Sequence, residues 1–112
     1  MESELKIFDR YCVLVLKDTA LRMSMTIDFR FKMTGIIKNH SPNLILDCTG
    51  VRAMDSSFIA SVFAAGNECK ASNGRLIVVT ESPQLRKLLL IGGEHQPVSL
   101  ADDVETAAAE LA

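Results

Sequence analysis

Three consecutive polar residues stand at the start of the best-marked helix that the sequence predicts. Asp55, Ser56 and Ser57 directly precede an apolar run with helical spacing. Asp and Ser are favoured N-cap residues, and one cap stabilises a helix by about 1 kcal/mol. One residue is enough for that, however, so capping leaves a pair of adjacent serines unexplained. Because N–H groups and the dipole at a helix N-terminus favour an anion, the segment predicts either a plain cap or a site of phosphate chemistry.

The rest of the chain predicts alternating strands and helices around this segment. Short apolar runs without alternation are typical of strands covered on both faces, and apolar residues three and four apart predict helices. We expect strands at 12–16, 43–47 and 75–80 with an edge strand at 97–100, and helices within 26–39, from 56, from 83 to Gly92-Gly93, and from about 99. This order indicates an α/β domain with a mixed, mostly parallel sheet of four to five strands and four helices.

The helices have predicted buried stripes. In the last helix, Asp102 and Asp103 are expected in the first turn, where acidic groups suit the helix dipole. The first helix is expected to bury Phe29, Met33, Ile36 and Ile37, and the second Ile59, Val62, Phe63 and Gly66. The third is expected to bury Leu85, Leu88 and Leu89, and the last Val104, Ala108 and Leu111.

Composition narrows the class of protein. The 112 residues fit one domain, residues 1–112, and 48% apolar content excludes intrinsic disorder. Twelve basic and 14 acidic residues are interspersed with a net charge of −2, which predicts no nucleic-acid surface. Apolar stretches are far shorter than the roughly 20 residues of a membrane span, and the acidic N-terminus is unlike a secretory signal. We therefore expect a cytoplasmic protein with no membrane association.

The residue types that commonly serve in catalytic or metal sites are present, but they lack the neighbouring residues that such sites require. Cys12, Cys48 and Cys69 are odd in number and form no CxxC pair, which predicts buried free thiols and no metal site. Ser56 lies in no Gly-x-Ser-x-Gly elbow, and no phosphate-binding glycine loop is present, so neither catalysis nor a cofactor is expected. His40 and His95 are predicted in surface loops. Asp47 and Asp55, the two candidates for an acid–base pair, fall on a strand end and a helix cap.

An ordered set of motifs resembles the STAS domain of anti-sigma-factor antagonists. It covers about 43–111, and none of its pieces is specific alone. The set comprises Leu46-Asp47, Thr49-Gly50-Val51, Met54-Asp55-Ser56-Ser57, then the strand at 74–79, the helix entry at 82–89 and the acidic entry at 102–107.

The resemblance implies a partner-switching mechanism. Ser56, directly after the Asp, is the position that the family implies is phosphorylated, with Ser57 as a secondary site. The implied partners are a serine kinase that doubles as anti-sigma factor, of the histidine-kinase-like ATPase type, and a serine phosphatase. The implied partner-binding residues are Asp55, Ser56, Ser57 and Phe58. Ser57 is expected to cap the helix or to accept phosphate, and a homodimer is left open.

Two departures from the family pattern matter. Phe58 stands where the commonest members have Gly, and Ser-Phe-Ile-Ala resembles the stressosome scaffold branch. We weigh two places for Phe58, an exposed docking residue or a buried staple under the helix. The N-terminal third lacks the family's usual loop element, for which Lys17-Asp18-Thr19 is the nearest candidate. The alternative function is an adaptor without phosphorylation, as a stressosome or transport-ATPase subunit.

Overall fold

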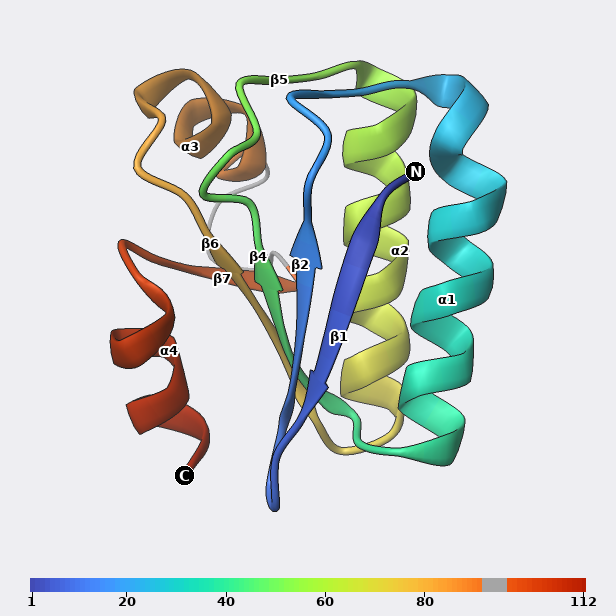
Figure 1. The fold of residues 1–112 in the computed structure, drawn as a ribbon, viewed down its shortest axis with the longest axis vertical. Coiled ribbons are helices and arrows are strands. Elements are labelled where there is room, and N and C mark those ends of the chain that lie inside the picture. Colours follow the sequence, from blue (N-terminus) through green and yellow to red (C-terminus); the bar gives the residue numbers. More distant parts are fainter. Residues whose placement is uncertain (92–96) are drawn as a thin grey trace.

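In the computed structural model, which describes residues 1–91 and 97–112, the four predicted strands and one that the sequence analysis missed, β1, form a five-stranded sheet of order β1-β2-β4-β6-β7 (Figure 1). β1 runs antiparallel to β2, and the other neighbours are parallel. The strands are β1 Ser3–Ile7, β2 Cys12–Leu16, β3 Ala20–Leu21, β4 Asn43–Asp47, β5 Ala53–Met54, β6 Arg75–Val79 and β7 Val98–Ala101. The helices are η1 Met23–Met25 (a 3-10 turn), α1 Thr26–Asn39, α2 Ser56–Ala71, α3 Pro83–Leu89 and α4 Val104–Leu111. The expected α/β architecture is confirmed.

Alternate residues of each central strand enter two different cores. On β4, Leu44 and Leu46 join the larger core under α1, α2 and α3, whereas Ile45 joins the smaller core under α4. The neighbouring strands β2 and β6 divide their residues in the same way. Burial on both faces explains why these strands read as uninterrupted apolar runs in the sequence.

The helices cover the sheet unequally. α1 and α2 lie side by side on one face, and α4 lies on the other (Figure 1). The predicted stripe of α1, comprising Phe29, Met33, Ile36 and Ile37, is confirmed as its buried face. Thr34 also donates a hydrogen bond to Glu68, with 3.1 Å between Oγ1 and Oε1, and so joins the two helices.

Two helix predictions need correction. The buried face of α2 is Phe58, Ser61, Val62, Ala65, Gly66 and Cys69, so the predicted stripe was displaced towards one side: Ile59 and Phe63 are only partly buried. α4 begins at Val104 and not near Ser99, because β7 extends to Ala101 to pair with β6. Asp103 is its N-cap and accepts a hydrogen bond from Thr106 N–H at 2.7 Å.

The ends of α3 and α4 complete the comparison. α3 ends at Leu89, and its Leu85 and Leu89 are buried whereas Leu88 is partly exposed. In α4, Ala107 is the fully buried residue, and Val104, Ala108 and Leu111 pack around it less completely. The predicted helix end at Gly92-Gly93 and the prediction for His95 lie outside the described residues. His40 is exposed just after α1, as expected.

None of the helices in residues 1–91 and 97–112 has both the length and the apolar character needed to cross a membrane. Within those same ranges, no three His, Cys, Asp or Glu side chains gather in a way that could hold a metal ion.

All three cysteines are buried and unpaired, as predicted. Burial raises the pKa of the Cys12 thiol and raises the pKa of Cys69 to about 12. Burial also raises the pKa of the Cys48 thiol, and the nearby negative charge of Asp47 adds to that effect. A thiol with a raised pKa stays protonated at neutral pH, and the thiolate is the reactive form.

We therefore expect the folded protein to resist thiol reagents. At about pH 8, Ellman's reagent should react with the native chain at least about a hundredfold more slowly than with free cysteine. In guanidinium chloride the same sample should release three equivalents of chromophore. Fast labelling of any cysteine in the native protein would contradict the buried placement.

Candidate functional site at the start of helix α2

Asp55 joins the beginnings of two helices through its carboxylate. One oxygen accepts a hydrogen bond from the backbone N–H of Phe58 at 2.9 Å, which caps α2. The other accepts from the backbone N–H of Met23 at 2.7 Å, in the 3-10 turn that leads into α1. Both oxygens thus hold backbone groups, and the residue positions the segment that follows it.

The small sheet of β3 and β5 supports the same segment from behind. The backbone N–H of Asp55 donates to the carbonyl of Leu21 at 3.0 Å. The N–H groups of Arg52 and Ala53 both donate to the carbonyl of Thr19, at 2.7 and 3.2 Å. The turn before α2 is therefore fixed to the loop after β2 by backbone bonds, so the first residues of α2 have a defined place.

Ser56 and Ser57 occupy different surroundings although they are adjacent. Ser56 is the first residue of α2, is exposed, and makes no side-chain hydrogen bond within the described part of the chain. Ser57 is partly buried, and its carbonyl accepts a hydrogen bond from the Ser61 hydroxyl at 3.2 Å. Successive helix residues point about 100° apart, so the two hydroxyl groups leave the helix in different directions. Asp55 and not Ser57 caps the helix, which corrects that part of the prediction.

An apolar groove of about 200 Å³ lies beside Ser56, between α2 and α3. Sequence reasoning missed it, since Ile59 and Phe63 were assigned to the core and Leu88 to a buried stripe. The available signal was the run of four apolar residues from Leu88 to Ile91, at and just after the end of α3. One buried stripe does not need four consecutive apolar residues. The lining residues are Met54, Ser56, Ile59, Phe63, Leu88 and Ile91.

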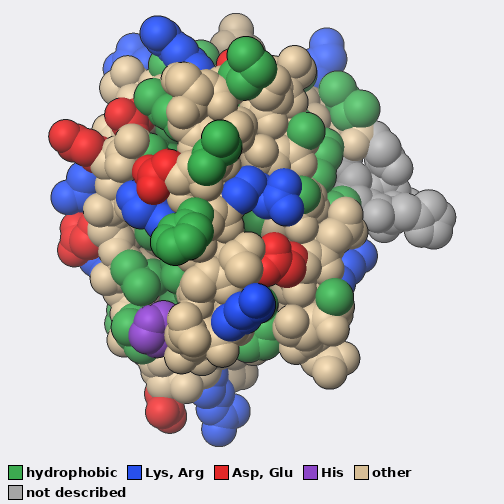
Figure 2. Space-filling model, turned by 90° about the vertical axis from the view of Figure 1, so that its right-hand side faces the viewer, with side chains coloured by type: hydrophobic (Ala, Val, Ile, Leu, Met, Phe, Trp, Pro, Cys, Tyr) green, Lys and Arg blue, Asp and Glu red, His purple; other side chains and the backbone are tan. Residues whose placement is uncertain are grey.

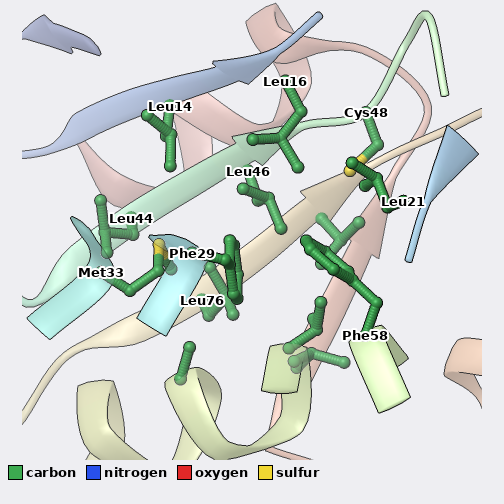
Figure 3. Close-up of a cluster of buried hydrophobic side chains, with 14 of the residues drawn as sticks. Leu14, Leu16, Leu21, Phe29, Met33, Leu44, Leu46, Cys48, Phe58 and Leu76 are labelled. Atoms are coloured by element: carbon green, nitrogen blue, oxygen red, sulfur yellow. The ribbon is translucent and has the colours of Figure 1, made fainter. Parts of the chain in front are cut away.

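Phe58 lies in the core and is excluded from any exposed contact surface. It has no accessible surface, and its ring packs against Phe29 of α1 with 4.7 Å between ring centroids, tilted by 46° (Figure 3). Of the two places considered for it, the buried staple is therefore the observed one. Its inclusion among the partner-binding residues is wrong for this conformation, because the backbone of α2 points the ring towards α1.

Asp47 is likewise occupied locally. At the end of β4, its carboxylate accepts hydrogen bonds from the backbone N–H of Thr49, at 3.0 Å, and from the Thr49 hydroxyl. Asp47 and Asp55 each close their own turn, as the sequence indicated.

Comparisons with known proteins agree with this architecture. The STAS domain family model matches residues 12–107, and so includes the N-terminal third that the motifs had left out. No curated protein matches the chain.

Solved structures match over nearly the whole chain. The anti-sigma factor antagonist SpoIIAA in its unphosphorylated form is 25% identical, with 97% of this chain and 96% of that chain covered and a TM-score of 0.75. The Bacillus cell fate determinant SpoIIAA in its phosphorylated form is also 25% identical, with 99% and 100% covered and a TM-score of 0.76. A serine-to-glutamate variant of RsbS from Moorella thermoacetica is 15% identical, with 99% and 95% covered and a TM-score of 0.79, and shows the fold.

The double role of Asp55 predicts a larger stability loss than an ordinary cap. Asp55→Ala is expected to lower the free energy of unfolding by about 2 kcal/mol, because it removes a cap and also leaves the Met23 N–H without its partner. The matched control is Asp103→Ala, which removes an exposed Asp cap whose hydrogen bonds go only to Thr106 in its own helix, and it should cost less than Asp55→Ala. Equal losses in urea titrations of the two variants would mean that the bond to Met23 contributes nothing.

The burial of Phe58 predicts a structural role. Phe58→Ala should lower the free energy of unfolding by about 3–5 kcal/mol, since it removes a buried ring and leaves a cavity against Phe29. Phe31→Ala, at a position that is 81% exposed, should change it by less than about 0.5 kcal/mol in dilute solution. A Phe58→Ala variant as stable as the parent would place the ring outside the core.

Proposed function

Because the chain belongs to the STAS family, we propose that it is an anti-sigma-factor antagonist that works by partner switching, with Ser56 as its phosphorylation site. In its unphosphorylated form it binds a serine kinase that also acts as an anti-sigma factor. The kinase, of the histidine-kinase-like ATPase type, transfers the γ-phosphoryl group of ATP to the Ser56 hydroxyl and releases ADP and a proton. A serine phosphatase restores the binding form. The chemistry belongs to these cytoplasmic partners, and the chain itself supplies a surface.

The observation that carries the proposal is the position of Ser56. Its hydroxyl is exposed at the start of α2 and makes no hydrogen bond among the described residues, so a kinase can reach it without opening the fold. It also borders the apolar groove between α2 and α3. A phosphate placed there would stand at the edge of a surface suited to apolar side chains.

The charge of the phosphate determines how much phosphorylation weakens the binding of the partner. A phosphoserine carries about −1.5 to −2 charges at neutral pH, beside the existing negative charge of Asp55. A partner that covers the phosphate must remove its water next to apolar side chains, which costs free energy. The phosphate is also repelled by any acidic residues of the partner. A coupling of about 1–3 kcal/mol lowers an affinity roughly 5- to 150-fold. No rearrangement of the domain is needed for that effect.

Asp55 and Ser57 have supporting parts in this proposal. The carboxylate of Asp55 already accepts two backbone hydrogen bonds, so it holds the turn in place for the kinase. Ser57 is partly buried and points towards a different side of α2. It is therefore the secondary phosphorylation site, and Ser56 and Ser57 together form the polar edge of the partner surface.

Ser56 variants test the switch directly. The purified chain is incubated with each serine kinase of this type from the source organism, with ATP and Mg²⁺, and then examined by mass spectrometry. One phosphate is expected on Ser56 in the parent and in the Ser57→Ala control, and none on Ser56 in Ser56→Ala. In a binding assay Ser56→Ala should bind the kinase persistently when ATP is present, and Ser56→Asp should bind roughly 5- to 150-fold more weakly.

Two outcomes would contradict the proposal in different ways. If no kinase phosphorylates Ser56 although the parent binds a kinase, the chain is an adaptor without a phosphorylation switch. If Ser56→Asp and Ser56→Ala bind the kinase like the parent, the charge at this position does not control binding.

A further inference from the structure

The outer face of α1 exposes large apolar side chains that no part of the described chain covers. Ile27 is 85% exposed and Phe31 is 81% exposed, one helical turn apart on the same face. Isolated apolar residues are common on protein surfaces, but two neighbouring ones this exposed on one helix are not explained by the fold. In Figure 2, which shows the side of the molecule that carries α1, hydrophobic side chains lie among Lys, Arg, Asp and Glu side chains.

One further turn along the same face is a glycine that the fold does not require. A Cβ added at Gly35 would meet nothing within 4 Å, although glycine in a helix interior is less favourable than alanine. Gly35 lines a hollow of about 400 Å³ beside Phe31, together with Leu5, Leu14 and Ile36. Ser3, Lys32, Asn39 and His40 line the rest of the hollow, and its volume is large enough for an aromatic ring.

We infer that α1 forms a two-fold symmetric homodimer, in which Phe31 of each protomer fills the hollow at the partner's Gly35. A two-fold interface joins a surface to itself, so each protomer must carry both the projecting ring and the hollow. Phe31 and Gly35 are four residues apart on one helix face, which is the arrangement that two antiparallel copies of the helix need. A different partner protein would not require both features on the same helix.

The charges on α1 fit the same arrangement. With the symmetry axis midway between Phe31 and Gly35, residues equally far from that midpoint lie opposite each other in nearly antiparallel helices. Asp28 then faces the partner's Lys38, and this pair occurs twice. Lys38 is exposed, and the Asp28 side chain remains 43% exposed although it pairs with Lys32 at 3.2 Å and with the N-terminal amine of Met1 at 3.6 Å. The two-fold symmetry therefore places the negative charge of Asp28 opposite the positive charge of the partner's Lys38.

The dimensions of the molecule indicate how much of the face that carries α1 is buried in the dimer interface. A specific interface buries about 800 Å² on each partner. The protein measures 31 × 26 × 24 Å, so such an interface includes most of the face that carries α1. The partly exposed Leu5 of β1, next to the hollow, then belongs to it.

The dimer is independent of the proposed switch. Ser56 borders the groove between α2 and α3, whereas the hollow at Gly35 is lined by residues of α1, β1 and β2 and by none of α2. A second copy seated on α1 therefore leaves Ser56 open, and the association can be measured without kinase or ATP.

Sedimentation equilibrium of the full chain from roughly 1 μM to 1 mM tests the inference. The parent should show a reversible monomer–dimer equilibrium. Phe31→Ser should weaken it at least about a hundredfold, because each truncation removes two symmetric central contacts. The control Leu90→Ser replaces an exposed apolar residue at the end of α3 and should leave it unchanged.

Two further variants test the symmetry. Gly35→Ala should weaken the dimer at least about tenfold by placing a methyl group where the partner's ring packs, yet raise the melting temperature of the dilute monomer by about 4 °C, since alanine favours the helix. Lys38→Asp should weaken the dimer about tenfold by opposing like charges, and the double variant Asp28→Lys with Lys38→Asp should restore it.

A parent chain that stays monomeric at all these concentrations would overturn the inference. A dimer that tolerates both Phe31→Ser and Gly35→Ala would also overturn it. Failure of the charge reversal to restore the dimer would rule out the two-fold register proposed for α1.

Discussion

The carboxylate of Asp55 is the constraint on which the candidate site depends. It accepts one backbone hydrogen bond from α2 and one from the 3-10 turn that leads into α1, so a single side chain holds the start of α2 and this turn together. Helix N-termini otherwise leave N–H groups unpaired, and these groups attract anions. Because Asp55 already holds the Phe58 N–H, the serine that follows is left with a solvent-facing hydroxyl and a fixed position.

A fixed position determines how a phosphate on Ser56 would act. The turn is secured by the bonds to Thr19 and Leu21 and by the core packing of Phe58 on Phe29. Under the proposed switch, a phosphate on a surface held in this way would change its charge and hydration and leave its shape the same. That response suits a chain with a net charge of −2, for which one phosphate nearly doubles the net charge. The small size of the domain is no obstacle, since the effect is confined to one edge of one groove.

Sequence patterns predicted the parts of this fold that are buried on both sides. The strands at 12–16 and 43–47 and the stripe of α1 were found because burial forces apolar residues into a simple period. β1 was missed because four of its five residues are exposed, and β3 and β5 because two residues carry no period. The stripe of α2 was misplaced for a related reason: Ile59 and Phe63 are apolar but line a groove, whereas the small polar Ser61 is buried.

The site could be predicted only in part, for the same physical reason. Asp55 and Ser56 follow from local helix chemistry, because capping involves residues three apart. The groove beside Ser56 joins α2 to the end of α3, and the bond from Asp55 to Met23 joins residues 32 positions apart, so neither has a local pattern. Phe58 is instructive here, since its exposure depends on which way α2 turns against α1. Only the packed structure decides that.

The two sides of α2 face different surfaces of the molecule. The side facing α3 carries Ser56 and the apolar groove, and the side facing α1 leads to the exposed Phe31. In a dimer through α1, each assembly would present two copies of the Ser56 surface. Two linked sites bind a bivalent partner more tightly than either site alone, provided that the partner can occupy both sites at once. Phosphorylation of both copies would then remove two contributions together, so a modest charge effect at each serine would produce a steeper release of the partner than one site gives.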